Sequence, residues 1–289
     1  MSSLSRQSEA KKNHGEAKKN RSAEGSLRCV EYLLLCSTVI VIAGPLLLLS
    51  CGTGWNWPRL LPDHPGFTNW RTLLSQDTGL LSAMGTSAAL ACLTSFTATA
   101  IGLIMSRAAA LSTGITMRVI LFLPWIISPV VAAVSLYQLL AGLSLAGSLA
   151  GVVAAQLVFA APFAAIILRD VWNHQTHQMI RLVKDLGGSA PAVWMHVIWP
   201  RVRRLLPLCL LQTALFSWLD YGIVSVIGGG RVDTITVRLF ALLREAGLNQ
   251  AALAAIMLMT PAIVFGIPLA VQRMQLPAIL NDGAEGLSD

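Results

Sequence analysis

The sequence predicts an all-α integral membrane protein with six transmembrane helices and with both chain termini in the cytoplasm. Of its 289 residues, 55% are hydrophobic and only 12% are charged, whereas soluble domains carry about 25% charged residues. The charges are clustered, which leaves long apolar runs of the kind that span a bilayer. The positive charges also concentrate in segments that would lie on one side of the membrane. These three observations exclude the soluble fold classes.

The chain opens with a polar segment, residues 1–28, which is basic and aperiodic. Such a composition cannot bury enough apolar surface to fold alone, so we expect a disordered basic cytoplasmic tail. The apolar run at about 31–50 is too long and begins too late for a secretory signal peptide, and it predicts an uncleaved first transmembrane helix. A transmembrane domain of residues 29–273 and a short cytoplasmic tail of residues 274–289 complete the predicted organisation.

Five further runs are long and apolar enough to span a bilayer, which takes about 20 residues. The sequence from Val119 to Leu168 carries no charge and is roughly twice the length of one span. We divide it near its middle, where the small residues of AGLSLAGSLAG supply a turn. The predicted helices lie at about 79–106, 119–141, 148–168, 205–227 and 249–271.

The basic residues indicate the orientation of these helices. An even number of spans places both termini on one side. With that side in the cytoplasm, the cytoplasmic segments hold sixteen Lys and Arg residues and the outer segments hold five. This excess follows the positive-inside rule and accounts for the net charge of +7. A nucleic-acid-binding protein would instead gather basic residues on one folded face, so we expect no nucleic-acid partner.

No motif predicts catalysis or metal binding by this chain. The cysteines share no CxxC spacing, which argues against a disulfide framework or a zinc site. His174 and His177 are three residues apart but have no third ligand nearby, which favours solvated polar residues. The sequence contains no HExxH, no Ser/His/Asp constellation and no phosphate-binding GxxxxGK[ST] loop. We therefore expect no enzymatic activity, no bound cofactor and no metal. The cysteines are Cys29, Cys36, Cys51, Cys92 and Cys209.

The cytoplasmic loop predicted at 169–204 contains a pattern of helices and breaks. The apolar residues of HQTHQMIRLVKDL have helical spacing, and Gly187 and Gly188 end that helix. Ser189 is a suitable N-cap for a second helix, and we expect Pro200 to stop it. A helix on the membrane surface and an element that docks in a groove of a cytoplasmic partner explain this pattern equally well.

The same stretch, DLGGSAPAVWMHVIWP, resembles the cytoplasmic EAA loop of binding-protein-dependent ABC importer permeases. That motif reads Glu-Ala-Ala, three residues, Gly, nine residues, Ile, one residue, Leu-Pro. The glycine aligns with Gly187. The isoleucine, leucine and proline positions then fall on Val197, Trp199 and Pro200. The Glu-Ala-Ala positions hold Arg-Leu-Val, at 181–183.

Other segments resemble the same family, and the match is closest to its iron, thiamine, polyamine and aminoethylphosphonate group. They include the predicted entry to the second helix, the proline-containing third helix, the helix before the loop and the segment after the fifth helix. These segments read FTNWRTLLSQDTGLLSAMGTSAALA, LFLPWIISPVVAAVSL, LVFAAPFAAIILRDVW and FSWLDYGIVSVIGGGRVDTITVRLF.

The resemblance implies the type I ABC importer permease fold in the bacterial inner membrane, surrounded by lipid. It implies that a solute-binding protein delivers substrate from outside and that a second permease subunit, a copy or a different chain, completes the path. It also implies that cytoplasmic ATPase subunits use the ATP. Val193, Trp194 and Val197 would then fill the ATPase groove. The implied coupling residues are Leu186, Gly187, Gly188, Ser189, Val193, Trp194, Val197 and Pro200.

Polar residues within the predicted spans are candidates for the translocation path, because such residues are costly in lipid. Asp220 is the first candidate, and it would meet a cationic substrate, pair with an arginine or face the outer water. The other candidates are Gln156, Gln138 and Gln212. The alternative function is a secondary transporter or channel with no ATPase partner. A single clear carboxylate within the spans weakens that alternative.

Overall fold

The computed structural model describes residues 37, 41, 44–53, 64–65, 70–71, 79–112, 115–245, 248–261 and 264. The predicted tails at 1–28 and 274–289 lie outside these residues, as does most of the predicted helix 31–50. The chain divides into two compact units, Met1–Asn69 and Trp70–Asp289. In the first unit, residues 44–51 are helical, and β1 (Gly52–Thr53) pairs antiparallel with β2 (His64–Pro65).

The described part of the second unit is helical, and two of its helices are long and apolar enough to cross a membrane. The helix α3 (Leu80–Leu111) covers the predicted span 79–106 and continues past it. The helix α6 (Leu149–Leu168) coincides with the predicted span 148–168. A third candidate span exists if a bent helix pair counts as one. The predicted total of six spans and the side on which the termini lie stay predictions.

The predicted single helix 119–141 is wrong, because the structure has two helices there. These are α4 (Ile115–Ile126) and α5 (Pro129–Gly142). Pro129 begins α5, and Ser128 before it has an extended ψ of 132°. A proline disfavours helical geometry in the preceding residue, so the break follows from Pro129. Hydropathy alone does not detect it, because both sides are equally apolar.

The predicted helix 205–227 is also broken. The helix α9 (Trp199–Leu219) ends at Asp220, and α10 (Gly222–Gly228) follows with a bend of 60° between them. Asp220 has a ψ of 117°, which is extended backbone. The bend therefore places the candidate carboxylate at the junction of two helices rather than inside one.

Between the predicted spans 205–227 and 249–271 the structure has a further helix, α11 (Ile235–Arg244). Its first turn is capped by Thr234, whose hydroxyl accepts from the Val237 backbone N–H at 3.4 Å. Ile235, Leu239 and Leu242 pack in a core cluster with α3 and α12 (Leu248–Leu258). Their helical spacing was the signal that could have identified this helix.

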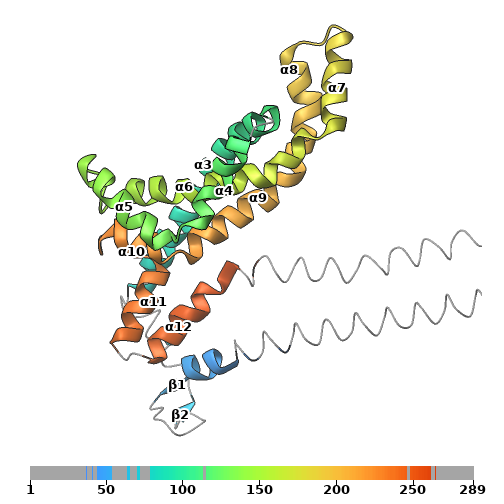
Figure 1. Ribbon diagram of the computed structural model, residues 1–289. Helices are drawn as coiled ribbons and strands as arrows, with labels where there is room; N and C mark the ends of the chain where they lie inside the picture. Colours follow the sequence, from blue (N-terminus) through green and yellow to red (C-terminus); the bar gives the residue numbers. More distant parts are fainter. Residues whose placement is uncertain are drawn as a thin grey trace, which may run out of the picture. The chain divides into compact units, whose positions relative to one another are not determined.

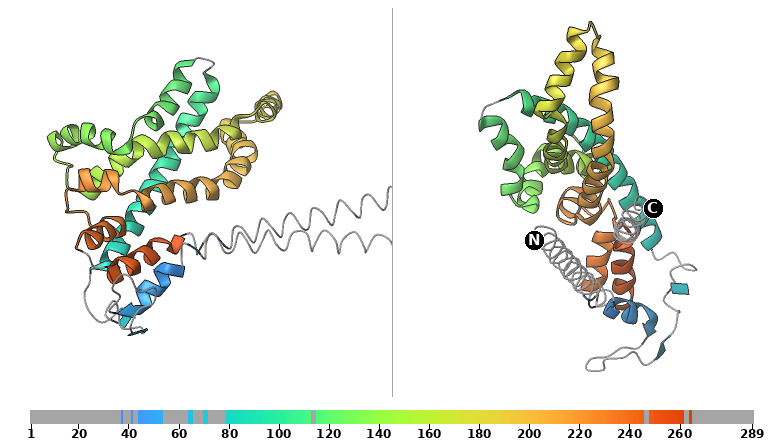
Figure 2. Two further views of the ribbon diagram at one scale, coloured as in Figure 1. Left: turned by 60° about the horizontal axis from the view of Figure 1, so that its bottom comes forward. Right: turned by 90° about the vertical axis from the view of Figure 1, so that its right-hand side faces the viewer.

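The helix α3 is the centre of the packing, since it lies along both α6 and α9 (Figures 1 and 2). A carbon added at Gly102 would lie 2.5 Å from the Cβ of Ala164 and 2.9 Å from the Ala165 backbone nitrogen. These small residues let the two apolar helices approach closely, as is common in membranes.

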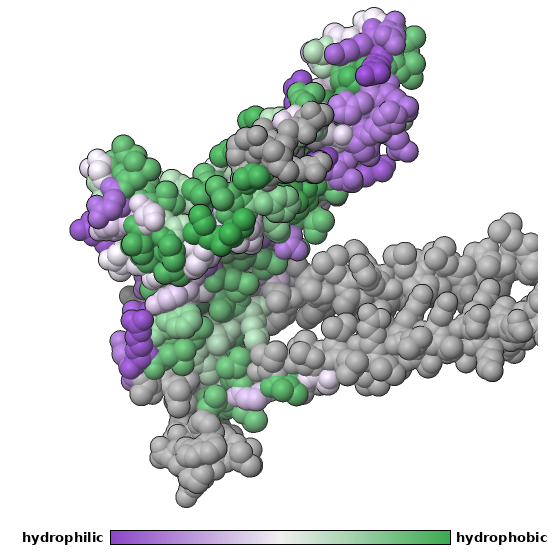
Figure 3. Space-filling model, in the orientation of Figure 1, coloured by the Kyte–Doolittle hydropathy of each residue, from purple (hydrophilic) through white to green (hydrophobic). Residues whose placement is uncertain are grey.

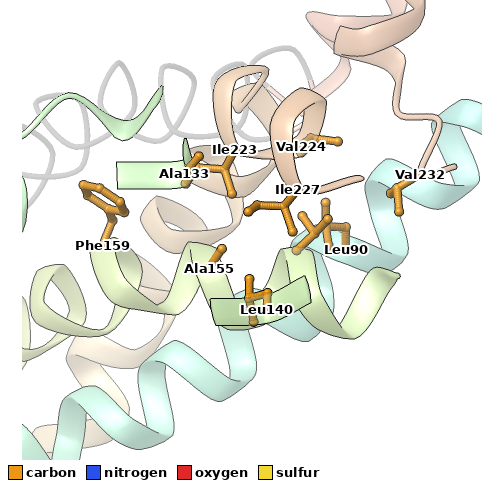
Figure 4. Packing of buried hydrophobic residues seen from close by; sticks show 10 residues of the cluster. Leu90, Ala133, Leu140, Ala155, Phe159, Ile223, Val224, Ile227 and Val232 are labelled. Atoms are coloured by element: carbon orange, nitrogen blue, oxygen red, sulfur yellow. The ribbon is translucent and has the colours of Figure 1, made fainter. Parts of the chain in front are cut away.

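A cluster of buried hydrophobic residues joins α3, α5, α6 and α10 (Figure 4). Leu90 of α3, Phe159 of α6 and Ile223 of α10 are among its members, each at most 2% exposed. In Figure 3 apolar side chains cover much of α6, whereas hydrophilic ones cover much of α7 (His174–Asp185). The cluster thus holds α10 against the long helices after the bend.

We expect Gly102→Ala to lower the free energy of unfolding by about 1–3 kcal/mol, because the added carbon overpacks the α3–α6 contact. Denaturant unfolding of the purified protein in detergent measures this change. Gly85→Ala on the same helix is the matched control, because an added carbon there meets nothing within 4 Å and alanine favours a helix over glycine. An equal loss in the two variants would contradict the close approach of α3 and α6.

Candidate functional site

The first candidate site is a helical hairpin, residues 169–198, whose base is fixed to the end of α3. It begins with the 3₁₀-helix η1 (Arg169–Trp172). The indole nitrogen of Trp172 donates to the hydroxyl of Ser106 at 3.0 Å, and the Arg107 guanidinium lies 5.9 Å from the centre of the indole ring. Trp172 is only 8% exposed. This hydrogen bond joins the base of the hairpin to the end of α3.

The first arm of the hairpin is α7, and it is capped at its start by Asn173. The Asn173 side chain accepts from the Thr176 backbone N–H at 2.9 Å. The buried Thr176 hydroxyl also donates to the carbonyl of Val171 at 2.7 Å. These bonds satisfy helix-end groups that would otherwise lack partners and fix the direction in which α7 leaves η1.

Two glycines make the turn between the arms, each for a different reason. Gly187 has φ +78°, a left-handed conformation that costs little only for glycine. Gly188 donates to the carbonyl of Val183 at 2.8 Å, and Gly187 donates to that of Lys184 at 2.9 Å. This is the Schellman pattern of a helix end. A carbon added at Gly188 would lie 2.5 Å from a Val183 methyl group, so this position has no room for a side chain.

The second arm continues into α9, and the prediction that Pro200 stops it is wrong. The arm consists of α8 (Ala190–Val193) and the π-helix η2 (Trp194–Ile198), and α9 begins at once with Trp199. The Trp199 backbone N–H donates to the carbonyl of Trp194, five residues back. The wider π turn lies where the Pro200 ring would otherwise meet a carbonyl of the preceding turn. The helix therefore absorbs the proline instead of ending there.

The structure also corrects the predicted docking face. Val193 and Val197 are only 6% and 4% exposed, and Val193 packs with Val171 and Trp172 inside the hairpin base. Trp194 is 40% exposed, and Leu186 and Met195 are 80% and 67% exposed. Ser189 takes the N-cap position, but its side chain makes no capping hydrogen bond. Leu186, Trp194 and Met195 are therefore among the apolar side chains of the hairpin that a partner can reach, together with Leu182 at 59% exposure.

The second candidate site is a polar cluster between the long helices, and it brings together two of the predicted path residues. The Gln156 side chain of α6 is fully buried, and its amide nitrogen donates to the Asp220 carboxylate at 2.9 Å. Its amide oxygen accepts from the hydroxyls of Thr94 at 2.9 Å and Ser217 at 2.7 Å. One side chain thus connects α3, α6, α9 and the bend.

Asp220 holds the bend from both sides. Its second carboxylate oxygen accepts from the Ile223 backbone N–H at 3.2 Å, which caps the first turn of α10. Its backbone carbonyl accepts from the Thr236 hydroxyl at 3.1 Å, which ties the bend to α11. An arginine partner, one of the predicted alternatives for Asp220, does not occur among its contacts in the described residues. Asp220 itself is half-buried.

The other two predicted path residues do not join this cluster. Gln138 on α5 and Gln212 on α9 are both exposed on the surface of the chain. The sequence does not identify Thr94 and Ser217 as site residues. Hydroxyl side chains are common in spanning helices, where they usually donate to a carbonyl of the same helix. The only available signal was the spacing of Ser217, three residues before Asp220. Among the described residues, no group of three His, Cys, Asp or Glu side chains is placed to hold a metal ion.

Comparison with known proteins found no family model and no curated protein that matches this sequence.

We expect Gln156→Met to lower the free energy of unfolding by about 2 kcal/mol, because it leaves the Thr94 and Ser217 hydroxyls and the Asp220 carboxylate without their shared partner. Gln138→Met is the matched control, since Gln138 is exposed, and it should change stability by less than about 0.5 kcal/mol. Denaturant unfolding in detergent separates the two variants. Equal stabilities of the two variants would mean that the hydrogen bonds of Gln156 make no net contribution to the free energy of unfolding.

Proposed function

We propose that the chain is the transmembrane permease subunit of an ATP-driven, binding-protein-dependent ABC importer. The observation that carries the proposal is the hairpin, a rigid element with an exposed apolar tip that continues without a break into α9. Its glycine turn lies at the position that resembles the EAA loop of such permeases. A surface helix lying on lipid would not need a helical connection of this kind to the polar cluster.

The proposed coupling is mechanical. A cytoplasmic ATPase receives Leu186, Trp194 and Met195 in a surface groove, and closure of the ATPase dimer on ATP moves the hairpin. The motion passes along the continuous helix from Ala190 to Leu219 and along the Trp172–Ser106 hydrogen bond to α3. Rigid elements joined to a packed, bistable core are the usual means of such switching.

The proposed translocation path runs beside the bend between α9 and α10. A broken helix exposes backbone groups at membrane depth, and such breaks are tolerated where they line a cavity or are buried in protein. Asp220 is half-buried at this bend and is the candidate contact for a cationic substrate. The Gln156 amide holds its carboxylate in place.

The remaining parts of the proposal come from the resemblance and the charge pattern. The protein lies in the bacterial inner membrane with six spans and cytoplasmic termini. Its partners are ATPase subunits, a second permease subunit and a solute-binding protein. Hydrolysis of ATP belongs to the ATPase.

The test places a charge on the exposed tip. We expect Leu186→Glu with Met195→Glu to abolish co-purification with the cognate ATPase and to reduce ATP-dependent uptake into vesicles at least about tenfold, because a carboxylate in an apolar groove is costly. Gln178→Glu, on the exposed and already polar surface of α7, should leave both unchanged. Full uptake by this chain with no ATPase present would contradict the proposal and support the secondary transporter or channel.

A further inference from the structure

A groove of about 310 Å³ lies between the end of α3 and the hairpin. Its walls combine the aromatic rings of Trp172 and Trp194 with apolar side chains such as Leu111 and Ile180. The Trp194 side chain is 40% exposed. The groove thus offers apolar and aromatic contact, and the Trp194 side of it is partly open to the surroundings.

The ionisable residues that line this groove are all of basic type. They are Arg107, His177 and Lys184. His177, Ile180 and Lys184 lie at positions i, i+3 and i+7 of α7, so they share one face of that helix. The two acidic residues of this region, Asp170 and Asp185, do not line the groove. Neither Arg107 nor Lys184 forms an ion pair with any described residue.

Arg107 lies beside the Trp172 ring at the groove. Its guanidinium lies over the Trp172 ring at 5.9 Å from the centre, and that ring is fixed by the Ser106 hydroxyl at 3.0 Å. A cation–π contact leaves the guanidinium N–H groups available at the ring edge. Those donors suit a phosphate, which accepts two parallel hydrogen bonds from arginine.

The groove lies next to a surface that suits acyl chains. It occupies one end of α3, a helix long and apolar enough to cross a membrane. Ile104 and Leu111 on that end are 72% and 69% exposed. A basic pocket between helices at a membrane surface is the usual site for an anionic lipid headgroup, and tryptophans favour the same depth.

We propose that this groove binds the headgroup of an anionic phospholipid, with the phosphate between Arg107 and Lys184 and the acyl chains along Ile104 and Leu111. Continuity with the apolar face of α3 favours a lipid over an acidic peptide, which would not use that face. The bound lipid would brace the hairpin against α3. This inference does not depend on the importer function, because it requires only that α3 spans the membrane.

Native mass spectrometry of the full chain in detergent tests the site, with phosphatidylglycerol and phosphatidylcholine of identical acyl chains as probes. We expect the unaltered protein to bind phosphatidylglycerol more tightly than phosphatidylcholine, and Arg107→Gln with Lys184→Gln to lower the affinity for phosphatidylglycerol about tenfold or more. Arg181→Gln with Arg203→Gln is the matched control. It removes the same charge from the same region, and neither residue lines the groove.

Three results would overturn the proposal. The first is equal affinity of the unaltered protein for the two lipids, and the second is an equal loss in the groove and control variants. The third is displacement of phosphatidylglycerol by an equal concentration of glycerol 3-phosphate, which would assign the groove to a free phosphate compound. Loss confined to the groove variant, without such displacement, supports the lipid.

Discussion

The amide of Gln156 is the constraint on which the bend, and with it the arrangement of the long helices, depends. It is fully buried and satisfies two hydroxyls and one carboxylate from three other segments. A buried polar group without a partner costs about 1–3 kcal/mol, and here one side chain prevents that cost at three places. Asp220 is half-buried among apolar helices. The hydrogen bond from Gln156 offsets part of the cost of burying its carboxylate.

The two candidate sites are parts of one mechanical connection. The hairpin ends in α9, and α9 ends at the bend that Asp220 caps. At the other end Trp172 joins the hairpin base to α3, and α3 returns to the network through Thr94. The glycine turn is therefore connected to Asp220 by two continuous sets of contacts. The proposed coupling to an ATPase would require a connection of this kind.

The sequence predicted the features that depend on composition and local chemistry, and it missed those that depend on tertiary contacts. The apolar spans of α3 and α6 follow from hydropathy, and the glycine turn follows from the conformations that glycine permits. The break before Pro129 is a local effect of the proline, whereas the break at Asp220 does not appear in a hydropathy average, because both of its flanks are apolar. The sequence pattern places Val193 on the docking face. Its burial depends on packing with Trp172, which the sequence does not show. Gln156 and Asp220 were both identified as polar, but nothing in the sequence paired them.

A double-mutant cycle between these two residues tests the central claim most directly. The free energy of unfolding is measured for Gln156→Met, Asp220→Ala, the double variant and the unaltered protein. If the Gln156 amide supports the bend through the Asp220 carboxylate, the two changes couple by at least about 0.5 kcal/mol. Additivity within about 0.3 kcal/mol would contradict the account, because it would mean that the bend is held without this hydrogen bond.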